Sequence, residues 1–214
     1  FHLRLCACGL SAVSGVGAAP PLTIMLVVGE PSGDQLGAQL MVGLKQLTKN
    51  RVRIVGVGGT AMIAEGLHSL FPLDATSVMG LREVVPRIPA ILRRVREAAD
   101  FAAKTRPDLV VLIDSPDFTH RIAQRIKRHD AAIRTANYPP PQVWASRSYR
   151  ARKMARYMAA VLTFFPFEAA FFERYAIRAI NVGYPVIERS RLITGGEEFR
   201  KRHGIAPDAP LLAV

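Results

Sequence analysis

The sequence of 214 residues has few cysteines, few acidic residues and no long uncharged apolar run. Its two cysteines, Cys6 and Cys8, are too close in sequence to staple a fold, which excludes a disulfide framework and favours a reducing compartment. No window reaches the roughly 20 apolar residues that a transmembrane helix requires. Because 29 basic residues face only 17 acidic ones, the formal net charge is +12 and we expect an anionic partner.

Other signals are absent as well. There is no zinc-finger spacing and no aromatic-basic pattern typical of single-strand binding, so we expect no nucleic acid among the partners. The Cys-x-Cys pair lacks further ligands nearby, and no third ligand accompanies the carboxylates discussed below, so we expect neither a metal nor a cofactor. Half of the residues are hydrophobic, which is enough for one α/β domain with its own core.

Apolar strand-like runs alternate with helical patterns from residue 22 onward. Strands are predicted at 22–28, 52–57, 68–71, 109–113, 133–138, 161–164 and 179–182. Helices are predicted at 35–47, 60–65, 81–104, 119–129, 167–175 and 196–203. Alternating units of this kind predict a parallel sheet with helices on both faces, and ligands then bind beyond the carboxyl ends of the strands.

The two ends of the sequence differ from this pattern. Residues 1–21 begin with Phe1 and contain an Ala/Gly/Ser-rich run, which suits a signal peptide or an upstream extension. We favour a disordered extension or a mis-called start, because glycines interrupt the run and a cytosolic α/β pattern follows. Residues 22–206 form the predicted domain. Residues 207–214 resemble a linker and the first strand of a second domain, which predicts that this sequence is truncated.

Three of the loops after strands carry candidate chemistry. The turn after residue 28 holds Glu30, Ser32, Gly33 and Asp34, and matches neither a dinucleotide fingerprint nor a phosphate-binding loop. It is equally compatible with a ligand site and with a turn in which Asp34 caps the next helix. Gly58 and Gly59, after the second strand, would allow close approach to a ligand.

Asp114 ends the most apolar strand, so its carboxylate should face the cleft, partly withdrawn from water, where it would be a better base. Asp117 is better explained as a cap of the following helix, and Phe118 lies beside it. Trp144, the single tryptophan, either lines the cleft or packs in the core.

Residues 81–95 combine an apolar stripe with arginines. The pattern is that of a membrane-surface helix or of an ordinary helix packed on the sheet. The candidate membrane-contact residues are Val84, Val85, Arg87, Ile88, Ile91, Leu92, Arg93 and Arg94.

Seven motifs in order resemble those of lipid-A-disaccharide synthases, over about residues 22–214. They lie at residues 29–34 (GEPSGD), 56–59 (GVGG), 77–84 (SVMGLREV), 113–118 (IDSPDF), 142–145 (QVWA), 165–168 (FPFE) and 182–185 (VGYP). The resemblance implies a Rossmann-like N-terminal domain of a GT-B fold, in an inverting glycosyltransferase. Such enzymes join UDP-2,3-diacylglucosamine to 2,3-diacylglucosamine 1-phosphate (lipid X) and release UDP.

The resemblance also assigns roles and a location. Asp114 becomes the base for the acceptor hydroxyl, and Glu30 a second functionally important residue. The substrate-binding residues implied are Ser32, Gly33, Asp34, Gly58, Gly59, Met79, Gly80, Asp117, Phe118 and Trp144. The family is cytoplasmic and peripheral to the inner membrane, which agrees with the basic charge and the amphipathic stretch.

Residues 139–142 and Tyr184 depart from the family pattern, in loops expected to face the cleft. We expect this chain, as the acceptor-side half, to be inactive alone. Two alternatives stay open: a non-catalytic module that binds acylated sugars or anionic lipid, and an epimerase-like GT-B enzyme acting on a soluble sugar nucleotide.

Overall fold

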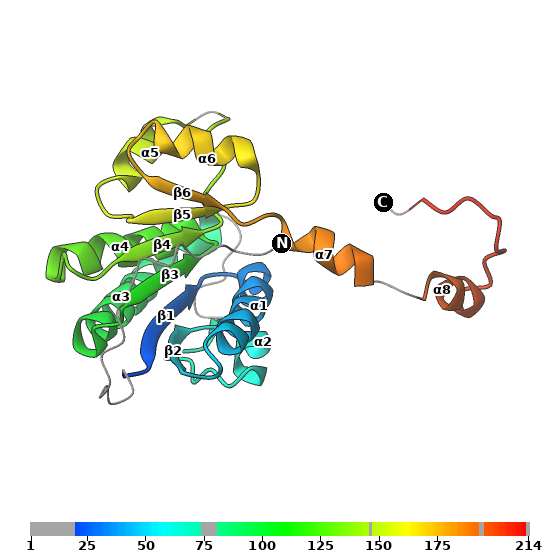
Figure 1. Cartoon of the computed structure of the whole chain (residues 1–214), viewed down its shortest axis with the longest axis horizontal. Coiled ribbons are helices and arrows are strands. Elements are labelled where there is room, and N and C mark those ends of the chain that lie inside the picture. Colours follow the sequence, from blue (N-terminus) through cyan, green and yellow to red (C-terminus); the bar gives the residue numbers. More distant parts are fainter. Residues whose placement is uncertain (1–19, 74–80, 146, 193–194, 213–214) are drawn as a thin grey trace, which may run out of the picture.

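The computed structural model describes residues 20–73, 81–145, 147–192 and 195–212. A six-stranded sheet in the order β2-β1-β3-β4-β5-β6, with every pairing parallel, forms its centre (Figure 1). The strands are β1 Leu22–Val28, β2 Val52–Val57, β3 Leu109–Ile113, β4 Thr135–Tyr138, β5 Ala160–Thr163 and β6 Arg178–Asn181. The predicted parallel sheet is therefore confirmed.

Helices connect the strands and cover both faces of the sheet. They are α1 Pro31–Leu47, α2 Thr60–Ala64, α3 Leu81–Thr105, α4 Pro116–His129, α5 Tyr149–Met154, α6 Pro166–Glu173, α7 Pro185–Leu192 and α8 Gly196–Arg202. The last two extend away from the sheet (Figure 1). None of the helices in the described part of the chain has the length and apolar content needed to span a bilayer.

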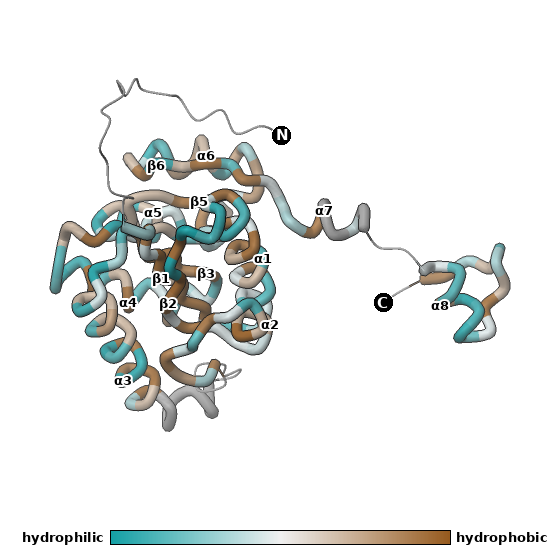
Figure 2. The backbone as a smooth tube through the Cα atoms, turned by 60° about the horizontal axis from the view of Figure 1, so that its bottom comes forward, coloured by the Kyte–Doolittle hydropathy of each residue, from teal (hydrophilic) through white to brown (hydrophobic). Residues whose placement is uncertain are grey.

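The alternation of side chains along β1 builds two separate cores. Met25 and Val27 pack with α3 and α4, whereas Leu26 and Val28 pack with α1 and α2. All four are fully buried, and in Figure 2 the central strands carry the colour of hydrophobic residues. A strand buried on both faces requires the continuous apolar run seen in the sequence.

Three details differ from expectation, the first being that no helix was predicted where α5 and α7 lie. Residues 68–71 make only an isolated bridge, between Ser69 and Gly56, in place of the predicted strand. Three of the predicted helices begin at prolines rather than at the first residue of the apolar pattern, at Pro31, Pro116 and Pro166, and the unpredicted α7 begins at Pro185. Proline lacks an N–H that the first turn would leave unpaired, and its fixed φ already suits a helix.

The sheet order places the candidate site. The chain leaves β1 toward β2 on one side and leaves β3 toward β4 on the other. The loops after these adjacent strands therefore diverge, and a crevice at such a switch point is the usual ligand site of open α/β sheets.

Candidate active site

A cavity of about 390 Å³ lies at the carboxyl end of the sheet. Asp114 is the predicted site residue that lines it. Its other lining residues come from the start of α4, from β4 and the segment after it, from the segment after β5 and from the turn before α7: Pro116, Asn137, Pro139, Pro140, Pro141, Gln142, Phe164, Phe165, Glu168 and Tyr184. The residues that depart from the family pattern thus face the cavity, as expected for Tyr184 and residues 139–142.

Two hydrogen bonds fix the half-buried Asp114 carboxylate. Ser32 donates its hydroxyl to Oδ2 at 2.7 Å, and the backbone N–H of Ser115 donates to Oδ1 at 2.9 Å. Each carboxylate oxygen has two lone-pair sites, so both keep capacity to accept a proton from a ligand. The sequence predicted Ser32 and Asp114 as site residues, and the structure brings these two together.

The backbone at this point is strained. Asp114 and Ser115 have φ angles of 57° and 42°, in the left-handed region that side chains other than glycine rarely adopt. Such residues cost of order 1–3 kcal/mol each and cluster at functional sites. Ser115, rather than the predicted Asp117, is the N-cap residue of α4.

Glycines let the turn after β1 approach the turn after β3. A Cβ atom on Gly29 would lie 2.3 Å from the Ser115 Cβ, and one on Gly33 would lie 3.0 Å from the Asp114 Cβ. Neither contact is possible for a larger residue without movement. The absence of a side chain at Gly33 therefore leaves room for Asp114. A role of Gly33 in substrate binding stays a prediction.

Asp34 is buried and faces α2. Its carboxylate accepts hydrogen bonds from the backbone N–H groups of Gly59 at 2.7 Å, Ala61 at 2.8 Å and Met62 at 3.2 Å. It therefore caps α2 rather than its own helix, which begins earlier, at Pro31. Gly58 donates its N–H to Ser69 Oγ at 3.1 Å. These contacts are structural, and substrate binding by Asp34, Gly58 and Gly59 remains a prediction.

The remaining predicted site residues are scattered. Glu30 is exposed at the N-cap of α1, and among the described residues its carboxylate makes no hydrogen bond or ion pair. Asp117 is exposed in the first turn of α4, while Phe118 is buried against Phe71 at a ring distance of 6.5 Å. Met79 and Gly80 lie outside the described residues.

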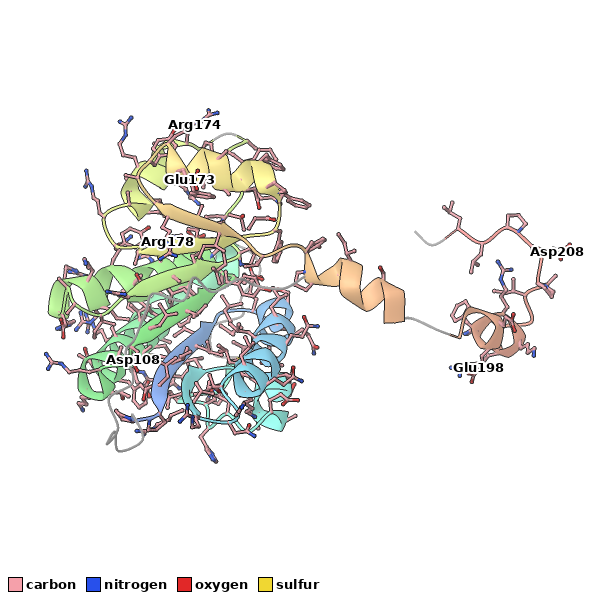
Figure 3. The ribbon with its side chains drawn as sticks, viewed as in Figure 1. Asp108, Glu173, Arg174, Arg178, Glu198 and Asp208 are labelled. Carbon is pink, nitrogen blue, oxygen red and sulfur yellow. The ribbon has the colours of Figure 1, made fainter. Side chains whose placement is uncertain are left out.

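The two carboxylates that flank β3 have different surroundings. Asp108 lies at the amino end of the strand (Figure 3) and accepts a hydrogen bond from the backbone N–H of Thr23 at 2.8 Å. It ties β3 to β1, whereas Asp114 at the other end lines the cavity. Strand polarity thus separates a structural carboxylate from a candidate catalytic one.

Sequence reasoning identified Trp144 but not the partner that holds it. Trp144 donates its indole N–H to Glu168 Oε1 at 3.3 Å. Glu168 is buried, and its Oε2 accepts the N–H groups of Phe164 at 3.1 Å and Phe165 at 3.0 Å. The glutamate therefore joins the loop that carries Trp144 to the start of α6.

A second residue missed by the sequence is Asn137, at the floor of the cavity. Its side chain donates to the Leu112 carbonyl at 2.9 Å and accepts from His120 Nε2 at 3.0 Å; His120 Nδ1 then accepts from the Tyr157 hydroxyl at 3.2 Å. Burial is the main cause that lowers the pKa of His120 below its ordinary 6.5, so the neutral ring suits this network. An Asn inside a predicted strand, where this residue type is uncommon, was the available signal.

The amphipathic stretch divides between surface and core. Ile88, Leu92 and Arg93 are exposed, while Ile91 packs against the core. Arg94 bonds Glu97 at 2.7 Å and lies 4.8 Å from the centre of the Phe71 ring. Val84, Val85 and Arg87 belong to α3, in a part where side chains are not described. Membrane contact by these residues stays a prediction.

Comparison with solved structures supports the fold. UDP-N-acetylglucosamine 2-epimerase from Rickettsia bellii superimposes with a TM-score of 0.56 at 12% identity, over 87% of this chain and 52% of that one. Likeness at this identity concerns the fold alone. Together with the sheet order it confirms the predicted fold class, a Rossmann-like domain of the GT-B type.

Comparison with sequences is more specific. Lipid-A-disaccharide synthases of Rhodospirillum centenum and Paramagnetospirillum magneticum are 44% and 45% identical to this chain, over 91% and 90% of its length. The matches cover 48% and 50% of those proteins, so the chain spans about half the length of the curated relatives it matches. The family described as lipid-A-disaccharide synthetase matches residues 24–214, and this chain belongs to it.

Proposed function

We propose that this chain is the acceptor-side half of an inverting glycosyltransferase that makes lipid A disaccharide phosphate. The substrates would be UDP-2,3-diacylglucosamine as donor and 2,3-diacylglucosamine 1-phosphate (lipid X) as acceptor. The observation that carries the proposal is Asp114, a strained and half-buried carboxylate that lines the cavity at the switch point of the sheet. Family membership supplies the substrates.

The chemistry needs one base. The acceptor hydroxyl would give its proton to Asp114 while its oxygen attacks the anomeric carbon of the donor, and the bond from that carbon to UDP would break. Ser32 and the Ser115 N–H orient the carboxylate, so the reacting group is held before the substrate arrives. Donor binding would fall mainly to a second domain, as the matched relatives are about twice as long.

The test combines substitution with complementation. We would fuse this chain to the second half of the Rhodospirillum centenum relative and measure disaccharide formation in mixed micelles. Asp114→Asn should lower turnover by roughly 100- to 10,000-fold, the usual contribution of a general base. Asn tolerates a left-handed backbone and can still accept from Ser32, so the fold should be kept. Undiminished turnover in this variant would remove Asp114 from the mechanism, and failure to bind lipid X in calorimetry would refute the acceptor half.

We also propose that the protein works on the cytoplasmic face of the inner membrane, as a peripheral protein. Support comes from the net charge of +12 and from Ile88, Leu92 and Arg93, which are exposed on α3. Each basic group near an anionic surface contributes about 1 kcal/mol. Sedimentation with vesicles containing phosphatidylglycerol should decrease in high salt and in Leu92→Glu. Binding that is indifferent to both changes would contradict this location.

A further inference from the structure

A row of aromatic rings leads from the cavity to the protein surface. We call it the aromatic band: Trp144, Phe164, Phe165, Phe167 and Tyr184. Tyr184 lies 4.8 Å from Phe164 and 5.8 Å from Phe165, ring centre to ring centre. Phe165 stacks on Phe167 at 5.8 Å, and Phe167 meets Trp144 edge-on at 5.0 Å. The inner members Phe164, Phe165 and Tyr184 also line the cavity beside Asp114.

Much of the band is open to solvent. Phe167 is 53% exposed, and Trp144 and Phe165 are each 39% exposed. Single exposed apolar residues are common on proteins, but contiguous exposed aromatic groups mark a surface that binds something. These rings would gain hydrophobic contact from any apolar group laid across them.

The Trp144 ring and the backbone at Phe164 and Phe165 are held in place before any ligand arrives. Buried Glu168 accepts the Trp144 indole N–H and the backbone N–H groups of Phe164 and Phe165. One carboxylate therefore anchors two of the three segments that carry the band, the third being the turn with Tyr184. A surface ordered in advance loses little conformational entropy when it binds.

The geometry indicates an amphiphilic ligand. The inner end of the row meets the Asp114 carboxylate at the cavity, whereas Phe167, the most exposed ring of the band, presents only carbon atoms. The band spans four successive ring-to-ring contacts and is therefore longer than one nucleotide base, since a base would stack on only one or two rings. A flexible hydrocarbon chain attached to a sugar suits both the length and the change from polar to apolar surroundings.

We propose that the aromatic band is the binding site for an acyl chain of the acylated sugar. The polar head of the same sugar occupies the cavity beside Asp114. This inference rests on the proposed function and adds to it a binding surface for one of the acyl chains. It assigns Phe167 and Phe165 to ligand affinity, and it places Trp144 in contact with the chain.

The single tryptophan makes the inference measurable. We would titrate the whole chain with lipid X bearing brominated acyl chains, and with glucosamine 1-phosphate as the matched ligand without acyl chains. Bromine quenches indole fluorescence on contact, so the acylated ligand should quench Trp144 and the deacylated one should not. Phe167→Ser should weaken binding of the acylated ligand about tenfold, because one large apolar contact is lost.

Phe199→Ser is the matched control, since Phe199 is 47% exposed on α8 and its ring contact is with His203. It should leave binding and quenching unchanged. Phe165→Ser tests the band a second time, should the first variant fold poorly.

The outcomes separate the two proposals. If lipid X binds in calorimetry without quenching Trp144, and binds the parent chain and Phe167→Ser with equal affinity, the acyl-chain binding site is refuted but the proposed function is not. Absence of calorimetric binding for both ligands would overturn both. Equal quenching by brominated phosphatidylcholine vesicles without any sugar would mean that the band contacts membrane lipid rather than the ligand's chain, and would also overturn the inference.

Discussion

The contact between Gly29 and Ser115 gives a sharp prediction about how the site is assembled. The added methyl of Gly29→Ala would lie 2.3 Å from the Ser115 Cβ and 2.7 Å from its Oγ, whereas carbon atoms pack at roughly 3.5–4.0 Å. One of the two turns must therefore move by about 1 Å. Such overpacking costs about 1–3 kcal/mol of unfolding free energy, and the movement would displace Asp114 as well.

Ser115→Gly should rescue the variant. It removes the clashing Cβ and suits the φ of 42° at that position, which favours glycine. We expect the single change to alter stability by less than about 1 kcal/mol, because relief of strain offsets the added entropy of the unfolded chain. The double variant should recover about 1–2 kcal/mol relative to the sum of the single effects, since the two residues are in contact.

Urea unfolding followed by far-UV circular dichroism would measure all three variants. Gly43→Ala is the matched control, because it lies within α1 and no atom lies within 4 Å of the position of its Cβ. This change should stabilise the protein by about 0.5–1 kcal/mol through helix propensity. If the effects of Gly29→Ala and Ser115→Gly on the free energy of unfolding proved additive, the close contact between the two turns would not be the cause of the destabilisation.

Three further predictions concern buried polar groups. Asp34→Ala should lower the free energy of unfolding in urea by about 2–4 kcal/mol, because it leaves the first N–H groups of α2 unpaired. The control Asp117→Ala, at an exposed position, should change it by less than about 0.5 kcal/mol. Equal effects would refute the role of Asp34 as the cap of α2. Burial lowers the pKa of His120 below 6.5, so the unfolded state binds the proton more tightly and the free energy of unfolding should fall as the pH drops through 6.5. In His120→Gln the free energy of unfolding should depend less steeply on pH between about pH 7 and 5. An unchanged dependence would contradict this prediction. Glu168→Ala should release Trp144 and shift its emission to longer wavelength, while an unshifted spectrum would mean that the hydrogen bond does not hold the ring.

Helix starts show where local pattern reading failed. The apolar spacing placed the first residues of three helices one to four positions late, since prolines were interpreted as turn residues. In the structure Pro31, Pro116 and Pro166 occupy the first helical positions. The signal was present in the sequence, because proline is common at that position and the preceding residue is extended or capping.

The site was predictable in part. Asp114 could be identified because a carboxylate after the most apolar strand of a parallel sheet must face the ligand edge, and the family motifs agreed. Asn137 and Glu168 could not be assigned, because their importance depends on which segments meet across the sheet. The cap by Asp34 was misplaced for the same reason: its partners are 25 to 28 residues away in sequence.

The sequence by itself determined the alternation of strands and helices, the parallel sheet and the edge at which we expect ligands to bind. These features depend on local hydrophobic patterning and on strand polarity, which every segment carries in its own residues. Only the tertiary structure decided which polar groups serve the fold and which remain available for chemistry. That distinction depends on distances between residues remote in sequence, such as Ser32 to Asp114 and Trp144 to Glu168, which no local pattern contains.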